Sequence, residues 1–143
     1  MNNVNEIETL LPHRSPFLFV DEIISADEKK IIARHLFTLN EFFFAGHFPR
    51  YPVVPGVILV ETMAQSGGAG LRKQGALGAD ALFFLASVDK VKFRRQVRPG
   101  EEVRSEIENL RVSAKMIKQS GRAFVKDELA AEAEWLCLVG NQQ

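Results

Sequence analysis

The sequence predicts an α+β fold in which one long helix is wrapped by a curved antiparallel β-sheet. The segment after Pro55 is apolar on almost all sides, and a helix without a polar face must be enclosed by other elements. Segments on both sides of it are rich in Phe, Val and Ile, and the last alternates apolar with acidic residues, as a half-buried strand does. The length of 143 residues allows a sizeable core, so we expect a single domain over residues 1–143.

The elements expected before the long helix are a short helix and a hairpin. Residues 6–11 form an amphipathic turn or helix that ends at a proline. Residues 17–25 and 30–38 are predicted as the two strands of a β-hairpin, because both are rich in β-formers and a polar turn separates them. Residues 40–55 are predicted as a loop, since one glycine and three prolines interrupt them.

The long helix is expected to begin with Pro55 at its first position and to end at Gly75 and Gly78. That gives a length of roughly 15 to 18 residues, within the usual range for globular helices. Its second half is rich in Gly and Ala, which allows the sheet to approach closely.

Three or four strands are expected after the helix. Residues 81–97 form the first and residues 102–118 the second, with a turn at Gln119-Ser120-Gly121. Residues 122–126 and 128–139 complete the sheet. In the last of these, one face is apolar and the other carries acidic residues, so one face is buried.

Composition argues against several classes of function. Lys+Arg and Asp+Glu both number 18, so no net charge points to nucleic acid or to an acidic membrane surface. Cys137 is the only cysteine, which excludes an internal disulfide, and it is expected in the core. The apolar stretch after Pro55 is too short to span a membrane, and the first residues lack the pattern of a signal peptide. We therefore expect a cytoplasmic protein that binds neither nucleic acid nor membrane.

His47 and Glu61 are the residues that point to chemistry. Between Gly56 and Gly70, Glu61 is the only ionisable side chain. A lone carboxylate among apolar neighbours is costly to bury as a charge, which favours its neutral acid form. His47 stands just before the helix, and a histidine ordinarily titrates at about pH 6.5. A base and an acid of this kind suit a reaction that removes one proton and delivers another.

The start of the helix supplies a third group. The N–H groups of Gly56, Val57 and Ile58 are expected to lack intrahelical acceptors and to lie at the positive end of the helix dipole. A carbonyl oxygen that gains negative charge would be stabilised there. Gln65 lies four residues after Glu61 on the same helix face, so its amide could orient the carboxyl group.

These groups together suggest a β-elimination. His47 would remove the proton beside a thioester carbonyl, and Glu61 would protonate the departing 3-hydroxyl group. The Gly56 N–H would hold the enolate-like oxygen. This chemistry needs no metal and no organic cofactor.

The other histidines and a basic run carry weaker signals. His35 is expected at the surface or half-buried, and His13 is expected to anchor the N-terminus. Five basic residues fall between Lys90 and Arg98 with no acid among them. They form either a solvated strand face or a local positive patch.

Several motifs together resemble those of a known family. They are the opening Leu10-Leu11-Pro12-His13-Arg14-Ser15-Pro16-Phe17-Leu18-Phe19-Val20-Asp21, the pair Gly46-His47-Phe48-Pro49 and Pro55-Gly56-Val57, and the strands Asp89-Lys90-Val91-Lys92-Phe93-Arg94-Arg95 and Ala130-Ala131-Glu132-Ala133-Glu134. The chain resembles the 3-hydroxyacyl-[acyl carrier protein] dehydratases of bacterial type II fatty-acid synthesis, the hot-dog-fold group with a broad chain-length range. A related group that also isomerises the double bond has Asp at the position of Glu61, so the resemblance favours a plain dehydratase.

The resemblance implies a hot-dog fold and a dimer in which His47 of one protomer faces Glu61 of the other, with three such dimers in a hexamer. It implies acyl carrier protein as the partner that delivers the phosphopantetheine-linked acyl chain, with Arg94 and Arg95 in its docking patch. The family's tunnel-gating aromatic, often tyrosine, falls at Phe84. Phe42 and Gln96 stand where the family often has proline.

Three alternative functions stay open at this stage. One is a hydratase or dehydratase of a specialised pathway that acts on CoA or polyketide-like acyl thioesters. Another is a hot-dog thioesterase, which would use a carboxylate to activate water. The third is a non-catalytic acyl-binding subunit that keeps the fold without turnover.

Overall fold

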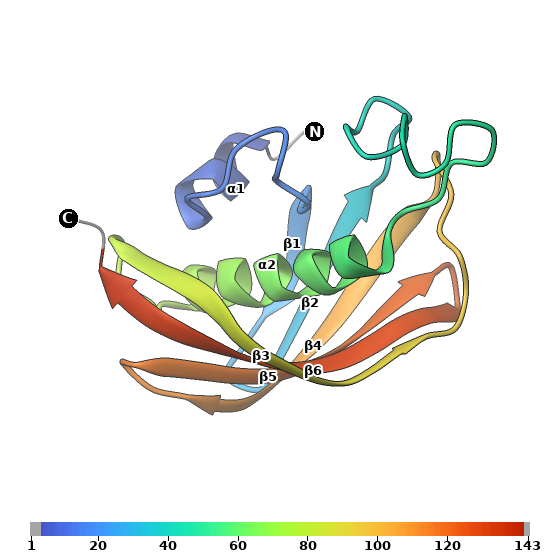
Figure 1. The fold of residues 1–143 in the computed structure, drawn as a ribbon. Coiled ribbons are helices and arrows are strands. Elements are labelled where there is room, and N and C mark those ends of the chain that lie inside the picture. Colours follow the sequence, from blue (N-terminus) through green and yellow to red (C-terminus); the bar gives the residue numbers. More distant parts are fainter. Residues whose placement is uncertain (1–3, 142–143) are drawn as a thin grey trace.

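A computed structural model describes residues 4–141, and Figure 1 shows helix α2 lying across one antiparallel sheet that curves around it. The elements in chain order are α1 (Val4–Leu10), β1 (Glu22–Ala26), β2 (Lys30–Leu36), α2 (Gly56–Gln74), β3 (Ala81–Phe93), β4 (Glu102–Val112), β5 (Met116–Val125) and β6 (Glu128–Asn141). Within residues 4–141, no helix is both long and apolar enough to cross a membrane.

The six strands are arranged in the order β1-β2-β4-β5-β6-β3, and each neighbouring pair is antiparallel. The two edges of the sheet are therefore β1 and β3. Helix α2 contacts all six strands, and the loop that precedes it lies beyond one end of the sheet (Figure 1). This arrangement places the start of α2 beside that loop.

The core lies between α2 and the concave face of the sheet. Its largest fully buried side chains are Trp135, Phe19, Phe37, Ile7, Leu11, Ile31, Met63, Leu71, Ile107 and Ile117, together with Gln65 and Gln119. The small residues of α2 allow the close approach that the sequence predicts. A methyl group on Gly68 would overlap the Phe83 ring of β3.

A buried amide also connects the helix to the sheet. Gln119 on β5 donates hydrogen bonds to the Gly67 carbonyl (3.3 Å) and to Asn109 Oδ1 (2.8 Å), and it accepts one from Trp135 Nε1 (3.1 Å). All of its polar atoms are thus satisfied inside the core, as burial requires.

The predicted long helix and loop agree closely with the structure, but several boundaries differ. The strands predicted to end at residues 38 and 97 end at Leu36 and Phe93. The helix begins at Gly56, and Pro55 is its N-cap with φ −58° and ψ 140° rather than its first helical residue. Gly75 ends the helix in the left-handed conformation (φ 92°), as the sequence predicts. Residues 17–21 were expected in the first strand, but β1 begins only at Glu22.

The predicted turn at residues 119–121 is wrong. These residues lie inside β5, and the chain turns earlier, where the Ser113 hydroxyl accepts hydrogen bonds from the N–H groups of Lys115 and Met116. Gly121 is a glycine for a packing reason: a side chain there would overlap the Trp135 ring. The alternation of the last strand is confirmed, with Ala131, Ala133, Trp135 and Cys137 buried.

Candidate active site

The His47 side chain is held in one orientation by the loop before α2. Its Nδ1 lies 2.9 Å from the Val53 carbonyl oxygen. Because a carbonyl can only accept, Nδ1 carries the proton and Nε2 is left with a free lone pair. The backbone fixes the same residue twice more, since the His47 N–H donates to the Phe43 carbonyl (3.0 Å) and its carbonyl accepts from Val53 (2.8 Å). His47 is therefore prepared to accept a proton at Nε2.

Glu61 lies in the second turn of α2 and is held by Gln65. Gln65 Nε2 donates to Glu61 Oε2 (2.9 Å) and to the Phe17 carbonyl (3.2 Å), while its Oε1 accepts from the Phe19 N–H (2.8 Å). The Phe19 N–H fixes which way the amide points, so the Gln65 NH2 group must face Glu61. Within residues 4–141, the second oxygen of Glu61 has no hydrogen-bond partner.

We expect Gln65→Met to lower kcat by about tenfold and to destabilise the fold by about 1–3 kcal/mol, because it removes the donor to Glu61 and leaves the Phe19 N–H unpaired. Steady-state kinetics and thermal unfolding measure the two effects. Gln119→Met is the matched control, because Gln65 and Gln119 are both 1% exposed but Gln119 makes no contact with Glu61. An equal loss of kcat in both variants would show that only stability is involved.

His13 approaches Glu61 from the segment after α1, which sequence reasoning missed. Its Nε2 lies 3.8 Å from Glu61 Oε2, and its ring lies against Phe83. Burial lowers the pKa of His13, and the charge of Arg14 lowers it further. The charge of Glu61 raises this pKa but does not cancel the effect of burial. Thus His13 faces Glu61 as a neutral imidazole near pH 7 rather than only anchoring the N-terminus.

Cys137 is a further buried group that is close enough to Glu61 to be affected by its charge. It lies in the core on β6, as expected, and burial raises the pKa of its thiol to about 11, with the Glu61 charge adding to the shift. The thiol is therefore protonated and unreactive at neutral pH.

The helix start presents two backbone donors rather than three. The N–H of Ile58 donates to the Pro55 carbonyl (2.9 Å), which corrects the expectation that it is free. Within residues 4–141, the N–H groups of Gly56 and Val57 have no acceptor. The ring of Phe93 lies directly over Gly56, so a side chain there would collide with it. Gly56 and Val57 remain the groups that can bind an oxyanion.

A pocket of about 530 Å³ opens beside the helix start. It is lined by Val54, Gly56, Val57, Leu59, Phe93, Arg94, Arg95 and Gln96. Its walls are largely apolar near the helix and cationic toward the residues after β3. Such a pocket suits a chain with an apolar part and a charged or polar end.

Phe84 lies away from the helix in this protomer. It is 57% exposed and pairs with Leu138, whose side chain alternates with buried Cys137 and so lies on the convex face. Its neighbour Phe83 is the ring that packs on α2. The role of Phe84 as a tunnel gate stays a prediction, and in the isolated protomer the ring that contacts α2 and His13 is that of Phe83.

Arg94 and Arg95 are both paired with carboxylates. Arg94 Nε donates to Glu132 (2.6 Å), whereas the two terminal nitrogens of Arg95 donate to the two oxygens of Glu101 and its Nε donates to Glu128. The hydrogen bonds with Glu101 and Glu128 raise the pKa of Arg95 above its ordinary range. Arg95 is thus engaged within the protomer, and Arg94 is the more accessible cation of the two.

Within residues 4–141 of one chain, no hydrogen bond or ion pair joins His47 to Glu61. His47 is fixed by the loop backbone, and Glu61 is fixed by Gln65 and the segment that contains Phe17 and Phe19. One protomer therefore holds the His47 imidazole and the Glu61 carboxyl group in two separately built environments.

These features define a hot-dog-fold protein whose central helix carries Glu61 in its second turn and follows a loop that holds His47. Solved structures agree on the fold. A chain of the dehydratase heterocomplex ApeI:P from Xenorhabdus doucetiae superposes with a TM-score of 0.78 at 16% identity, over 95% of this chain and 91% of that one. The Escherichia coli PaaI protein superposes with a TM-score of 0.62 at 14% identity, over 82% of this chain and 81% of the other.

Sequence comparison then identifies the family. The model of the FabA-like domain matches residues 11–134, and the chain belongs to this FabA-like family. It is 46% identical to the 3-hydroxyacyl-[acyl-carrier-protein] dehydratase FabZ of Desulforamulus reducens, over 99% of this chain and all of the relative. It is 41% identical to the protein of the same name from Clostridium perfringens, over 98% and 100% of the two chains.

Proposed function

We propose that this protein is a hydro-lyase of fatty-acid elongation that converts (3R)-3-hydroxyacyl-[acyl carrier protein] to the trans-2-enoyl thioester and water. The observation that carries the proposal is the state of the two proposed reacting groups: the Val53 carbonyl fixes His47 with a free Nε2, and Gln65 holds one oxygen of Glu61. Relatives with more than 40% identity over nearly the whole chain are named as dehydratases of this substrate.

The reaction follows from these groups. His47 Nε2 takes a proton from C2 of the bound acyl chain, and the electron pair of that C–H bond forms the C2=C3 double bond. The C3–O bond breaks as Glu61 gives its proton to the leaving hydroxyl, which departs as water. The N–H of Gly56 binds the thioester oxygen while negative charge builds on it. The cycle leaves His47 protonated and Glu61 ionised, and exchange of protons with solvent restores both.

The active unit is a dimer in this proposal, with His47 of one protomer facing Glu61 of the partner subunit. Strand β3 supports it, because among residues 4–141 of the protomer no strand pairs with its outer side. Its exposed apolar side chains are Phe84, Leu85, Val88, Val91 and Phe93, and Val57 at the helix start is 73% exposed. A long apolar edge of this kind requires a cover. Pairing of two β3 edges would bring each helix start to the other protomer, and three such dimers would form the hexamer.

The substrate carrier is acyl carrier protein, an acidic partner that inserts its pantetheine arm. The pocket beside the helix start supports this, because Arg94 and Arg95 line it together with Gly56 and Val57. Since Arg95 is held by Glu101, we assign the direct contact to Arg94 and a bracing role to Arg95.

The function is tested with purified protein and 3-hydroxybutyryl- and longer 3-hydroxyacyl-carrier proteins. Enoyl thioester absorbance and free-thiol release are followed together. We expect enoyl product without thiol. Thiol release without enoyl product would support a thioesterase instead, and carrier binding without either product would support a non-catalytic subunit. Equal rates with CoA thioesters or polyketide-like chains would favour a specialised pathway.

The shared site is tested by mixing inactive His47→Ala and Glu61→Ala chains. Each mixed dimer contains one complete site and one site that lacks both groups. With random exchange of subunits, half of the dimers are mixed, so we expect about a quarter of the wild-type activity. Native mass spectrometry of differently tagged chains verifies the exchange. Complete exchange with no recovered activity would place both groups of each site in one chain.

A further inference from the structure

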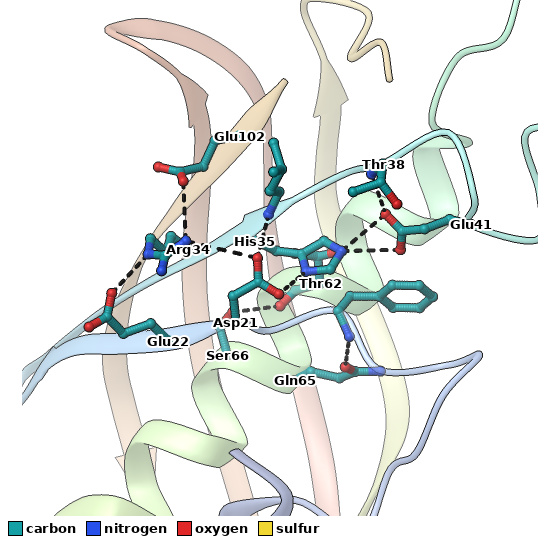
Figure 2. A network of polar contacts seen from close by, with 12 residues as sticks. Asp21, Glu22, Arg34, His35, Thr38, Glu41, Thr62, Gln65, Ser66 and Glu102 are labelled. Atoms are coloured by element: carbon teal, nitrogen blue, oxygen red, sulfur yellow. Dashed lines mark hydrogen bonds and ion pairs between the residues drawn. The ribbon is translucent and has the colours of Figure 1, made fainter. Parts of the chain in front are cut away.

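His35 is a buried histidine that the proposed reaction does not use. It lies on β2, is 7% exposed, and its ring is placed between two carboxylates. Nδ1 lies 2.9 Å from Asp21 Oδ1, and Nε2 lies 3.1 and 3.2 Å from the two oxygens of Glu41. Figure 2 shows the ring lying between these two acids, which come from different segments of the chain.

The geometry requires a charged ring. Ionised carboxylates only accept hydrogen bonds, so both ring nitrogens must carry protons. Burial alone would lower the pKa of His35, but hydrogen bonds and charges from Asp21 and Glu41 raise it to about 9. Burial alone would raise the pKa of Asp21, but contacts with His35, the Leu36 N–H and Arg34 lower it. The His35 ring is thus an imidazolium near neutral pH, held between Asp21 and Glu41.

One arm of this cluster leads to His47. Glu41 Oε2 accepts from the Thr38 N–H (3.1 Å), and the Glu41 carbonyl accepts from the Phe44 N–H (3.2 Å). Two residues further along the chain, the carbonyl of Phe43 accepts a hydrogen bond from the N–H of His47. The Phe43 ring also packs on Phe37, whose edge meets the His35 ring at 4.6 Å between centroids. The position of Glu41 therefore sets the path of the chain to His47.

The other arm leads to Glu61. Asp21 uses its second oxygen to accept from the Leu36 N–H (2.7 Å), which fixes the end of the segment 17–21 on β2. Within that segment, the Phe19 N–H donates to Gln65 Oε1, and Gln65 in turn donates to Glu61. The Phe19 ring lies against the His35 ring, with 5.9 Å between centroids. Displacement of Asp21 would therefore reach Glu61 through Phe19 and Gln65.

We propose that His35 is a positioning residue whose charged ring holds the His47 loop through Glu41 and the Glu61 support through Asp21. One buried cation would then orient both proposed catalytic side chains of a subunit. This inference rests on the proposed function for its kinetic consequence, but the geometry of His47 can be measured without turnover.

The cluster makes the fold sensitive to alkali. The titratable and charged groups around His35 are Asp21 and Glu41, with Arg34 3.9 Å from Asp21 and itself paired with Glu22 and Glu102. The pKa of His35 is raised from 6.5 to about 9 in the folded state. Its stabilising contribution is complete below about pH 6.5 and is lost as the pH rises through about 9. The wild-type melting temperature should decline across this window, and that of His35→Gln should decline less.

The test compares His35→Gln and Glu41→Gln with the wild type and with Gln119→Met, which loses a buried amide away from both arms. We expect kcat to fall by about 10- to 100-fold in the two cluster variants, with KM nearly unchanged, because displacements of about 1 Å have effects of this size. ¹⁵N NMR of the imidazoles should show His35 doubly protonated at pH 7.5, and His47 should lose its single Nδ1–H tautomer in the variants.

Several outcomes would overturn the proposal. They are a His35 that is neutral at pH 7.5, or variants in which kcat and the His47 tautomer match the wild type. A loss of kcat no greater than in Gln119→Met would reduce His35 to a stabilising role. If His35→Gln does not fold, Glu41→Gln decides the kinetic question, because it keeps the His35 ring but removes the charge and one of the two acceptor oxygens of residue 41. A wild type that forms no enoyl product refutes the proposed function, whereas the NMR signals still report on the cluster.

Discussion

Replacement of His47 by alanine is expected to lower kcat by about 10²–10⁴-fold, because it removes the nitrogen that takes the proton from C2 of the substrate in the proposed reaction. The Nδ1 proton is already committed to the Val53 carbonyl, so Nε2 is the only position where His47 can accept a proton. Steady-state formation of enoyl thioester measures the loss. A circular dichroism spectrum and a melting curve verify that the variant is folded.

Arg50→Ala is the matched control for His47→Ala, since Arg50 is exposed in the same loop. We expect its kcat to stay within about twofold of the wild type, as for surface substitutions in general. Added imidazole should restore part of the activity of His47→Ala, because it can enter the space of the lost ring and act as base. Full activity of a folded His47→Ala enzyme without imidazole would remove His47 from the mechanism.

Glu61→Gln is expected to cause a loss of similar size, about 10²–10⁴-fold in kcat, because an amide cannot give a proton to the leaving hydroxyl. The substitution keeps size and shape, and its amide oxygen can still accept the hydrogen bond from Gln65. The melting temperature should therefore change little while turnover is lost. The rate of enoyl formation from 3-hydroxybutyryl-carrier protein measures the loss of turnover.

Glu61→Asp supplies the comparison for Glu61→Gln. It keeps an ionisable acid but withdraws it by one methylene group, so we expect an activity between those of the wild type and Glu61→Gln. The ordering separates the ability to donate a proton from the shape of the side chain. A Glu61→Gln enzyme that turns over as fast as Glu61→Asp would contradict the role of Glu61 as the acid.

Features with a local cause could be predicted from the sequence. The long helix followed from its apolar surface and its Pro and Gly boundaries, and the contact between Glu61 and Gln65 followed from helical spacing alone. The misplaced turn had a different origin. Gly121 is a residue type typical of turns, but here the reason for glycine is packing. The Trp135 ring of the adjacent strand leaves no room for a side chain, and the sequence does not show that this strand is its neighbour.

The environment of His35 shows what local patterns can and cannot supply. The expectation of a surface or half-buried side chain was wrong. Its burial was within reach, because Ile31, Ala33 and His35 alternate onto one face of β2. Its partner Glu41 lies beyond the end of the strand, and His13 reaches Glu61 across 48 positions of chain. Contacts of this kind depend on how distant segments of the chain fold against one another. The spacing of residues in the sequence does not specify this.

The apolar rim of β3 has a consequence for handling the protein. As far as residues 4–141 show, a subunit on its own presents a 13-residue edge strand whose outward backbone groups have no partner and which carries large hydrophobic side chains, a template for uncontrolled association. Dilution should therefore lower solubility and turnover together. Activity lost on dilution would then fail to return when the protein is concentrated again. It would return only if new dimers form faster than the exposed strands aggregate.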